Sequence, residues 1–367
     1  FRGHDTDVSE SSPHFERLTR LAHDIRRFAP EPRTVGFDPL PLFQTNALDT
    51  RNGLDDHRPE SVIMDFPSAI SEESNMSQRA SFRIAALVGI ALAVSAFGAL
   101  AEEPWKVLPP MPELPPATVS GPVHVNDIDM WRAEFGPRDG KPVIMVHGGL
   151  SNSNYFGNVI PFLVSEGFHV IAVDSRGHGR STRSTQPYSY ELMASDVVAM
   201  LDALHIPKAD LVGWSDGGII GIVMAIHNPE HLNRVFAFGA NTVPEGLIPD
   251  FDKEGVFAAF EKRAGDEYKK LSPTPDQYAS FLKQINEMWA TQPHITDEQL
   301  EAIHTPITIA DGRYDEGIKQ SHDRYMASTI PDARLVILPG VSHFAMLQNP
   351  PLFARAVLDA LTAPWDN

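Results

Sequence analysis

The sequence predicts an α/β protein whose mostly parallel sheet is covered by helices on both faces. Strand-like and helix-like segments alternate from about residue 123 onward, which is typical of this fold class. The strand-like runs are continuously apolar, as strands buried on both faces are. A third observation is a long stretch between 240 and 305 without a strand pattern, which predicts helices inserted into the alternation.

The elements follow in order along the chain. Residues 123–135 alternate apolar and polar side chains and predict a hairpin of two strands. Buried parallel strands are predicted at 142–146, 168–174, 209–213, 234–239, 307–310 and 333–338. Helices are predicted between and after them, at 154–166, 190–204, 217–226, 318–328 and 350–361.

The inserted stretch predicts two or three further helices, and the Pro-rich segment before the hairpin predicts an extended chain. The helical segments are 251–270, 274–291 and 296–303. We expect a helical cap at 242–304 over the carboxyl ends of the strands, where open α/β sheets bind ligands. The α/β core then comprises 123–241 and 305–367, preceded by a linker or arm at 102–122.

Residues 1–75 differ in composition from the rest. They contain eight Arg and no Lys, whereas the remaining 292 residues contain nine Lys. They show no sustained apolar period of a helix or a strand. We therefore expect this segment to be disordered or a product of spurious upstream translation, with Met76 as the true start.

The segment 76–101 has the parts of a secretory signal peptide. A short basic stretch after Met76 precedes an 18-residue uncharged run, 84–101, that ends in Ala99-Leu-Ala101. We expect cleavage there and a mature protein in the periplasm or outside the cell, without stable membrane association. The alternative is an uncleaved N-terminal anchor, because 18 apolar residues can just span a bilayer.

Charge and composition exclude several classes of protein. The chain carries a formal charge of −18, and residues 102–367 alone carry −14, which argues against nucleic acid as a partner. The absence of cysteine excludes disulfides, thiolate metal sites and a cysteine nucleophile. The sequence contains no zinc-hydrolase histidine cluster and no phosphate-binding glycine loop. We expect a small-molecule substrate, no metal and no cofactor, and the oligomeric state stays open.

The segment 211–218 carries the strongest chemical signal. It places Ser215 between Gly213 and Gly217, with Trp214 preceding the serine, directly after a predicted strand and before a predicted helix. A nucleophile on so tight a turn has a strained backbone, and its neighbours two positions away must be small. This arrangement predicts a nucleophile elbow.

An acid and a histidine follow in the order that such a site requires. Asp315 follows the strand predicted at 307–310, and His343 follows the strand predicted at 333–338. Serine is a poor nucleophile unless a histidine removes its proton, and the histidine needs a carboxylate to fix its tautomer. We therefore expect Ser215, His343 and Asp315 to form a catalytic triad.

Two backbone N–H groups are expected to hold the oxyanion. One belongs to Asp216, directly after Ser215, where the turn aims it at the developing charge. The second belongs to Gly149, or alternatively to Leu150, in the loop that follows the strand predicted at 142–146.

Nearby residues compete for two of these roles. His304 and His322 are the rivals of His343, but one precedes a strand and the other lies inside a predicted helix. Asp311 and Glu316 are the rivals for the acid, and Asp311 lies so close to the strand end that we expect it to shape the turn.

From about 123 to 362 the sequence resembles the α/β-hydrolase superfamily. The elbow carries the resemblance, together with the segment 174–181 (DSRGHGRS), which looks like the loop after the fourth strand of that family. The resemblance implies an α/β-hydrolase fold with a helical cap and a serine hydrolase, above all a carboxylesterase. A serine at position 215 argues against the dehalogenases and epoxide hydrolases of this superfamily, which use aspartate there.

The elbow is also similar to that of the valacyclovir hydrolase group. The residues concerned are 213–218 (GWSDGG) and 239–241 (GAN). That group cleaves α-amino-acid esters and holds the amino group with the acid beside the nucleophile, which here implies Asp216. The alternative is that Asp216 is a helix-start carboxylate stabilised by the helix dipole.

The substrate itself is open at this point. Phe281, Met288 and Trp289 in the inserted stretch either line an acyl pocket or form the cap's own core. Alternative activities of the same triad are those of a lactonase, an α-amino-acid ester hydrolase or aminopeptidase, and a C–C bond hydrolase. A non-catalytic binding protein of the same fold is the alternative from another class.

Overall fold

The structure is a computed structural model, and it describes residues 103–365. Its centre is an eight-stranded sheet in the order β1-β2-β4-β3-β5-β6-β7-β8. The strands are β1 (Val119–Val125), β2 (Ile128–Phe135), β3 (Pro142–Val146), β4 (His169–Val173), β5 (Ala209–Trp214), β6 (Leu232–Phe238), β7 (Ile307–Gly312) and β8 (Ala333–Leu338). The pairs β1/β2 and β2/β4 are antiparallel, and all pairs from β4 to β8 are parallel. The predicted mostly parallel sheet is confirmed.

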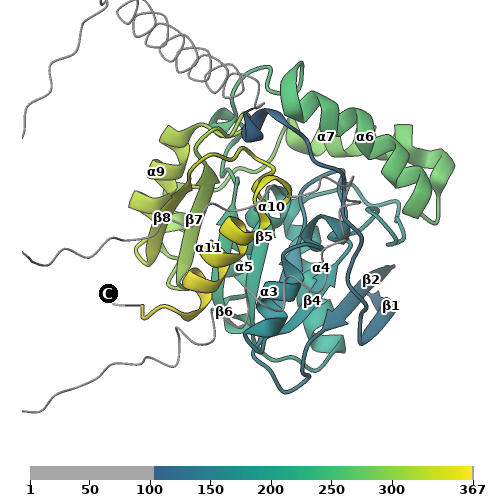
Figure 1. Cartoon of the computed structure of the whole chain (residues 1–367), viewed down its shortest axis with the longest axis horizontal. Coiled ribbons are helices and arrows are strands. Elements are labelled where there is room, and N and C mark those ends of the chain that lie inside the picture. The colour runs from purple at the N-terminus through teal and green to yellow at the C-terminus, as the bar shows by residue number, and fades with distance from the viewer. Residues whose placement is uncertain (1–102, 366–367) are drawn as a thin grey trace, which may run out of the picture. The chain divides into compact units, whose positions relative to one another are not determined.

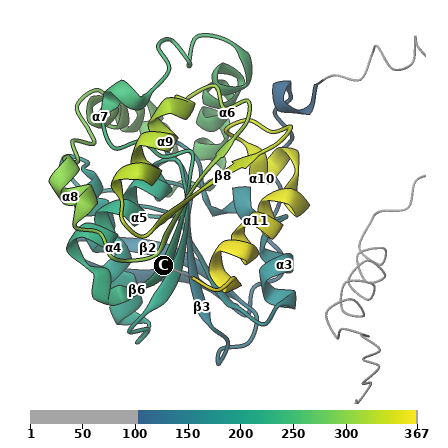
Figure 2. The same cartoon turned by 90° about the vertical axis from the view of Figure 1, so that its left-hand side faces the viewer.

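Helices cover both faces of this sheet. The α-helices are α3 (Ile160–Ser165), α4 (Tyr190–Ala203), α5 (Asp216–His227), α6 (Gly255–Leu271), α7 (Tyr278–Trp289), α8 (Asp297–Glu301), α9 (Gln320–Thr329), α10 (Ala345–Gln348) and α11 (Pro350–Thr362). Short 3-10 helices are η1 (Pro104–Lys106), η2 (Ser153–Phe156), η3 (Pro229–His231), η4 (Pro244–Gly246) and η5 (Pro275–Gln277). Figure 2 shows α4, α5 and α9 on one side of the sheet and α3 and α11 on the other. Every residue of β4 and β5 is consequently buried, which explains why all of them but His169 and Asp210 are apolar or glycine.

Two predicted elements have different bounds in the structure. The helix predicted at 154–166 divides into η2 and α3, because Pro161 lies in the first turn of α3, where its missing N–H costs nothing. The first strand begins at Val119, four residues before the predicted 123. Gly121 and Pro122 interrupt the alternation of apolar and polar residues in this strand, because both residue types are unusual inside a strand.

The Pro-rich segment before β1 is a packed arm. Its apolar side chains lie against the core; they are Leu108, Met111 and Leu114. The Gln348 side chain donates hydrogen bonds to the carbonyls of Trp105 (3.3 Å) and Val107 (3.0 Å). Arg263 of α6 donates to the carbonyl of Pro109 at 2.6 Å. The arm therefore joins α10 to α6.

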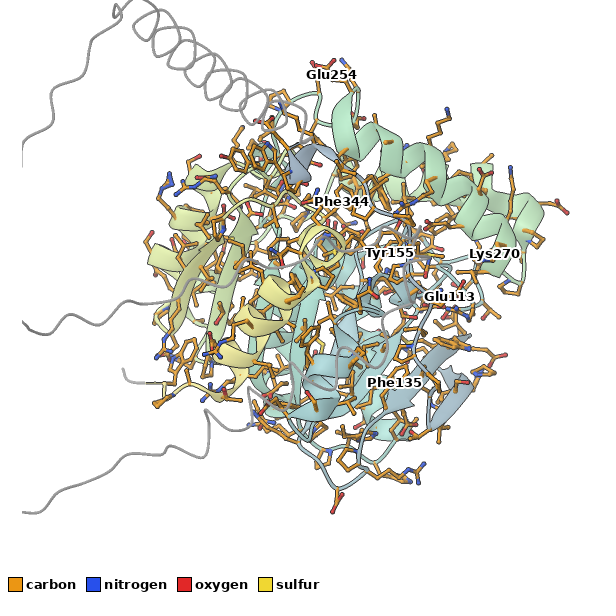
Figure 3. The ribbon with its side chains drawn as sticks, in the orientation of Figure 1. Glu113, Phe135, Tyr155, Glu254, Lys270 and Phe344 are labelled. Carbon is orange, nitrogen blue, oxygen red and sulfur yellow. The ribbon has the colours of Figure 1, made fainter. Side chains whose placement is uncertain are left out.

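Between β6 and β7 the chain forms α6, α7 and α8, where helices were predicted. Figure 1 shows α6 and α7 together at one end of the sheet. Phe260 of α6 packs against Phe344 and Tyr155, with ring centroids 5.1 Å and 5.8 Å away. Figure 3 shows Phe344 and Tyr155 nearer to this end of the sheet and Phe135 nearer to the other end. Aromatic side chains therefore fill the space between α6 and the sheet.

The expectations for residues 1–75 and for the signal peptide at 76–101 lie outside the described residues. Within 103–365, every helix is too short or too polar to cross a membrane.

Candidate active site

Ser215 occupies a strained turn between β5 and α5. β5 ends at Trp214 and α5 begins at Asp216, and the serine between them has φ 55° and ψ −119°. This left-handed backbone is costly for a residue with a side chain and persists only where the surroundings hold it. A Cβ atom on Gly213 would overlap the carbonyl of Gly217, and one on Gly217 would overlap that of Val146. Glycine is therefore needed on both sides of the serine, as its spacing predicts.

His343 and Asp315 form a buried pair next to this turn. The ring Nδ1 of His343 lies 2.6 Å from Asp315 Oδ2, and the two side chains are 2% and 0% exposed. The other oxygen of Asp315 accepts hydrogen bonds from the N–H groups of Gly317 (2.7 Å) and Ile318 (2.8 Å). Burial alone would raise the pKa of Asp315, but the neighbouring ring and the hydrogen bonds hold it below its ordinary value.

The pKa of the His343 ring is shifted in the opposite direction, above its ordinary value. Burial alone would lower the pKa of His343, but the adjacent carboxyl groups of Asp315 and Glu316 raise it above its ordinary value. The ring is thus able to carry a proton during a reaction, because Asp315 stabilises the imidazolium.

Ser215 and His343 line the same cavity of about 350 Å³. The Nε2 atom of His343 is buried and has no hydrogen-bond partner among the described residues. No hydrogen bond joins it to the Ser215 hydroxyl in this part of the chain, and such bonds often tighten only when substrate binds. The structure thus brings the three predicted triad side chains to one place, with the ring nitrogen that would take the serine proton still free.

The two expected oxyanion donors are also adjacent to the serine. A Cβ atom on Gly148 would lie 2.9 Å from the Cβ of Ser215, so the loop after β3 runs directly beside the nucleophile. The N–H of Asp216 is the first of α5 and has no partner within that helix. A Cβ on Gly149 would overlap the Trp289 ring, so this position requires glycine. Leu150, the alternative donor, is buried and has φ 60°.

The Asp216 side chain connects the cap to the elbow. Its Oδ1 accepts hydrogen bonds from the Tyr190 hydroxyl (2.9 Å) and from Trp289 Nε1 (3.0 Å), and its Oδ2 lies 3.0 Å from the same indole nitrogen. Burial raises the pKa of Asp216 to about 6, although both hydrogen bonds act against the shift. The carboxyl group also lines the cavity.

The structure divides the three cap residues that were candidates for an acyl pocket. Trp289 lines the cavity, together with Leu282 and Asn286 at helical spacing on α7. Phe281 and Met288 do not line it, because they lie on the neighbouring face of α7, which is buried. Phe281 stacks against Tyr268 of α6 at 5.0 Å. The pocket expectation is thus wrong for Phe281 and Met288, which belong to the cap's own core.

Three further acids surround Asp315, and sequence reasoning missed one of them, Asp323. Asp311 and Asp323 are fully buried, and the carboxyl groups of Asp315 and Asp323 are close enough to Asp311 to raise its pKa. Burial and the neighbouring Asp315 raise the pKa of Asp311 well above its ordinary value, and burial raises that of Asp323 to about 7. Glu316 accepts a long hydrogen bond from the His343 N–H (3.4 Å), and burial raises its pKa to about 7. Asp323 lies on α9, and nothing local to the sequence around it signals this contact.

The residues that compete with His343 and Asp315 for a place in the triad have other polar partners. His304 is exposed and lies 3.8 Å from Asp332, whereas His322 Nε2 accepts a hydrogen bond from the N–H of Thr242 (3.0 Å). Asp311 accepts a hydrogen bond from the N–H of Gly312 at 2.7 Å, so it shapes the turn as expected. Within residues 103–365, no cluster of three or more His, Asp or Glu side chains is placed to hold a metal ion.

Comparison with known proteins gives the same fold. A family model described as the alpha/beta hydrolase fold matches residues 141–275. The 2-hydroxy-6-oxo-6-phenylhexa-2,4-dienoate hydrolase of Burkholderia cepacia is 28% identical, over 68% of this chain and 99% of the relative. The 3-oxoadipate enol-lactonase 2 of Acinetobacter baylyi is 27% identical, over 63% of this chain and 92% of the relative.

A solved structure supports the same fold. The enol-lactonase of Burkholderia xenovorans superposes with a TM-score of 0.54 at 22% identity, covering 66% of this chain and all of that one. The family model and the relatives support an α/β-hydrolase superfamily hydrolase, and the solved structure shows the same fold.

Proposed function

We propose that this protein is a serine hydrolase that cleaves carboxylic esters through an acyl-enzyme intermediate. The observation that carries the proposal is the His343 ring. Its Nδ1 is held by Asp315 at 2.6 Å, while its buried Nε2 faces the cavity that Ser215 also lines. A general base oriented in this way beside a serine on a strained elbow serves acyl transfer.

The proposed reaction uses each group in turn. Ser215 Oγ attacks the ester carbonyl while His343 Nε2 takes its proton, and the N–H groups of Asp216 and Gly149 stabilise the oxyanion. His343 then donates the proton to the leaving alcohol as the C–O bond breaks. Water attacks the acyl-enzyme with His343 again as base, which releases the acid and regenerates Ser215. Asp315 stays ionised and stabilises the imidazolium.

The charge of the cavity favours an ester without a carboxylate. Among the residues described, the lining includes Asp216, Asp252 and Glu261 and no Lys or Arg. The two relatives named above act, by their names, on a dienoate and on a 3-oxoadipate lactone, both of which carry a carboxylate. Like charges repel strongly in a partly buried cavity, so those C–C and lactone substrates suit this pocket poorly.

An α-amino-acid ester is a second candidate substrate. The observation in its favour is the Asp216 carboxyl group, which lines the cavity directly beside Ser215. An ammonium group next to the scissile carbonyl would approach this carboxylate. Asp216 must then be ionised, which its pKa of about 6 permits in neutral solution.

The experiment is a set of initial rates on p-nitrophenyl esters from acetate to palmitate, plus one α-amino-acid ester, with Ser215→Ala as the blank. Hydrolysis of the neutral esters that disappears in the variant supports the proposal. If only the α-amino-acid ester is cleaved, the second candidate replaces it. Rates equal to the blank on every ester contradict both, and a lactone and a C–C substrate are the next to assay.

We also propose that the segment 76–101 directs export, on the strength of its basic start, its apolar run and its Ala-Leu-Ala end. N-terminal sequencing of the protein from a periplasmic fraction tests this. A chain that begins at Glu102 is the expected result, and retention of the apolar run contradicts cleavage.

A further inference from the structure

The cavity has two acidic side chains that the proposed ester chemistry does not use. Asp252 and Glu261 line it from the cap, in the loop before α6 and on α6 itself. Neither forms an ion pair with a Lys or Arg within residues 103–365, and the nearby Lys253 pairs with Asp250 instead. Burial and the charge of Asp252 raise the pKa of Glu261, so the two acids lie close enough to interact.

Helix α6 relates Glu261 to the catalytic histidine. The Phe257 ring lies 5.8 Å from the His343 ring, and Glu261 follows Phe257 by four residues on the same helix. Residues four apart lie on one face, about 6 Å from each other along the axis. Glu261 therefore lies about one helical turn along α6 from the side chain whose ring is next to His343.

Aromatic rings line the same part of the cavity. Phe251 and Phe257 contact each other edge to face at 4.5 Å, and both belong to the lining. Ring faces attract alkylammonium groups, and carboxylates within the same pocket add to that attraction. Apolar rings next to unpaired acids bind an organic cation better than they bind a neutral or an anionic group.

Asp216 is less available to bind an organic cation. Both of its oxygens already lie within 3.0 Å of the Trp289 indole nitrogen, and Oδ1 also accepts from Tyr190. Among the described acids that line the cavity, the carboxyl groups without such hydrogen bonds are therefore those of Asp252 and Glu261.

From this arrangement we infer that the protein prefers esters whose acyl chain ends in an alkylammonium group, held by Glu261 and Asp252 against Phe251 and Phe257. This inference rests on the proposed ester hydrolysis and goes beyond it, since it names the charge of the substrate and its distance from the carbonyl. A straight six-carbon acyl chain is about as long as one helical turn, which is the spacing of Phe257 and Glu261 along α6.

The test compares three p-nitrophenyl esters of equal chain length at about pH 8, where glutamate is ionised. One is the hexanoate, the second carries a trimethylammonium group on its terminal carbon, and the third carries a terminal carboxylate. The variants are Glu261→Gln, Asp252→Asn and their combination. Glu254→Gln is the matched control, because Glu254 is exposed at the start of α6 and outside the cavity lining.

We expect the wild type to show kcat/KM about tenfold or more higher for the cationic ester than for the neutral one, with the anionic ester slowest. The ratio of cationic to neutral ester should fall at least about threefold in each single variant and approach unity in the double variant. The ratio should stay unchanged in Glu254→Gln. A ratio near unity in the wild type, or one that the double variant leaves intact, overturns the inference while ester hydrolysis stands.

Two further measurements distinguish a cation site on the cap from a site beside the nucleophile, and cation binding from ester cleavage. If Asp216→Asn abolishes the preference and the cap variants do not, the cation binds beside the nucleophile and the inference is wrong. Calorimetric binding of trimethylammonio-hexanoate and of hexanoate to the wild type needs no turnover. Tighter binding of the cationic acid supports the inference even if no ester is cleaved, and equal or weaker binding overturns it.

Discussion

The indole nitrogen of Trp289 lies 3.0 Å from both carboxylate oxygens of Asp216. Trp289 is the last residue of α7 in the cap, and Asp216 is the residue directly after the elbow serine. One hydrogen-bonding group of α7 therefore contacts the residue whose own N–H we propose as an oxyanion donor. The position of the cap and the geometry of the elbow are coupled through this contact.

We predict that Trp289→Phe weakens this coupling. The variant keeps an aromatic ring but loses the N–H, which by itself lowers the pKa of Asp216. A buried carboxyl group without that donor should destabilise the fold by about 1–3 kcal/mol and lower kcat/KM by roughly tenfold. Denaturant unfolding and ester kinetics measure the two effects. Trp365→Phe, the same change near the C-terminus, is the control, and equal behaviour of the two variants would refute the coupling.

Asp315 and Asp311 provide a matched pair for testing the triad. Asp315→Asn should lower kcat by about 10³–10⁴, because an amide leaves His343 in the wrong tautomer. Asp311→Asn should cost less than about tenfold, since the His343 ring is held by Asp315 and not by Asp311, and an amide at 311 keeps an oxygen that can accept from the Gly312 N–H. Steady-state kinetics of both variants decide the point. A larger loss in Asp311→Asn would transfer the role of the acid to Asp311.

The pH dependence of the rate should report the His343 ring. The reaction needs this ring neutral, so kcat/KM should fall as the pH drops through a pKa that lies above the ordinary histidine value. Glu316 is one cause of the raised pKa of His343. Glu316→Gln should therefore move the acidic limb to lower pH. An acidic limb that stays in place, or moves upward, would contradict this electrostatic assignment.

Stability should also depend on pH through the buried acids. Burial raises the pKa of Asp323 from 3.8 in an open chain to about 7 in the fold, so the folded state binds more protons between these values. The contribution of Asp323 to the free energy of unfolding is therefore fully present below about pH 4 and is lost as the pH rises through about 7. Asp323→Asn should reduce the loss of Tm between about pH 5 and pH 8. The control is the exposed Asp266→Asn, and an identical pH profile in both variants would disprove the account.

The parts of the fold and site that the sequence predicts are those that depend on local pattern. The elbow follows from the spacing of Gly213, Ser215 and Gly217. Gly213 is required by the nearby backbone of Gly217, and Gly217 is required by the close approach of Val146 in β3. The buried strands follow from their continuous apolar runs. Asp315 and His343 could be placed because parallel strands bring the segments after their carboxyl ends to one edge of the sheet.

What the sequence does not predict depends on contacts between distant segments. Each α7 residue that lines the cavity directly follows a residue of the buried face. The lining residues are Leu282, Asn286 and Trp289, and the buried ones are Phe281, Ile285 and Met288. Both faces are largely apolar. Only the way α7 docks decides which face lines the cavity. The contact of Asp323 with Asp311 likewise depends on how α9 packs against β7, and no local periodicity reports it.

The central claim is that Ser215 is a nucleophile activated by His343. The most direct test is intact-mass spectrometry after incubation with a fluorophosphonate, followed by peptide mapping, on wild type, Ser215→Ala and His343→Ala. The account predicts a single adduct on Ser215 in the wild type, none in Ser215→Ala, and labelling slowed by orders of magnitude in His343→Ala. An adduct on another residue, or unchanged labelling in His343→Ala, would contradict it.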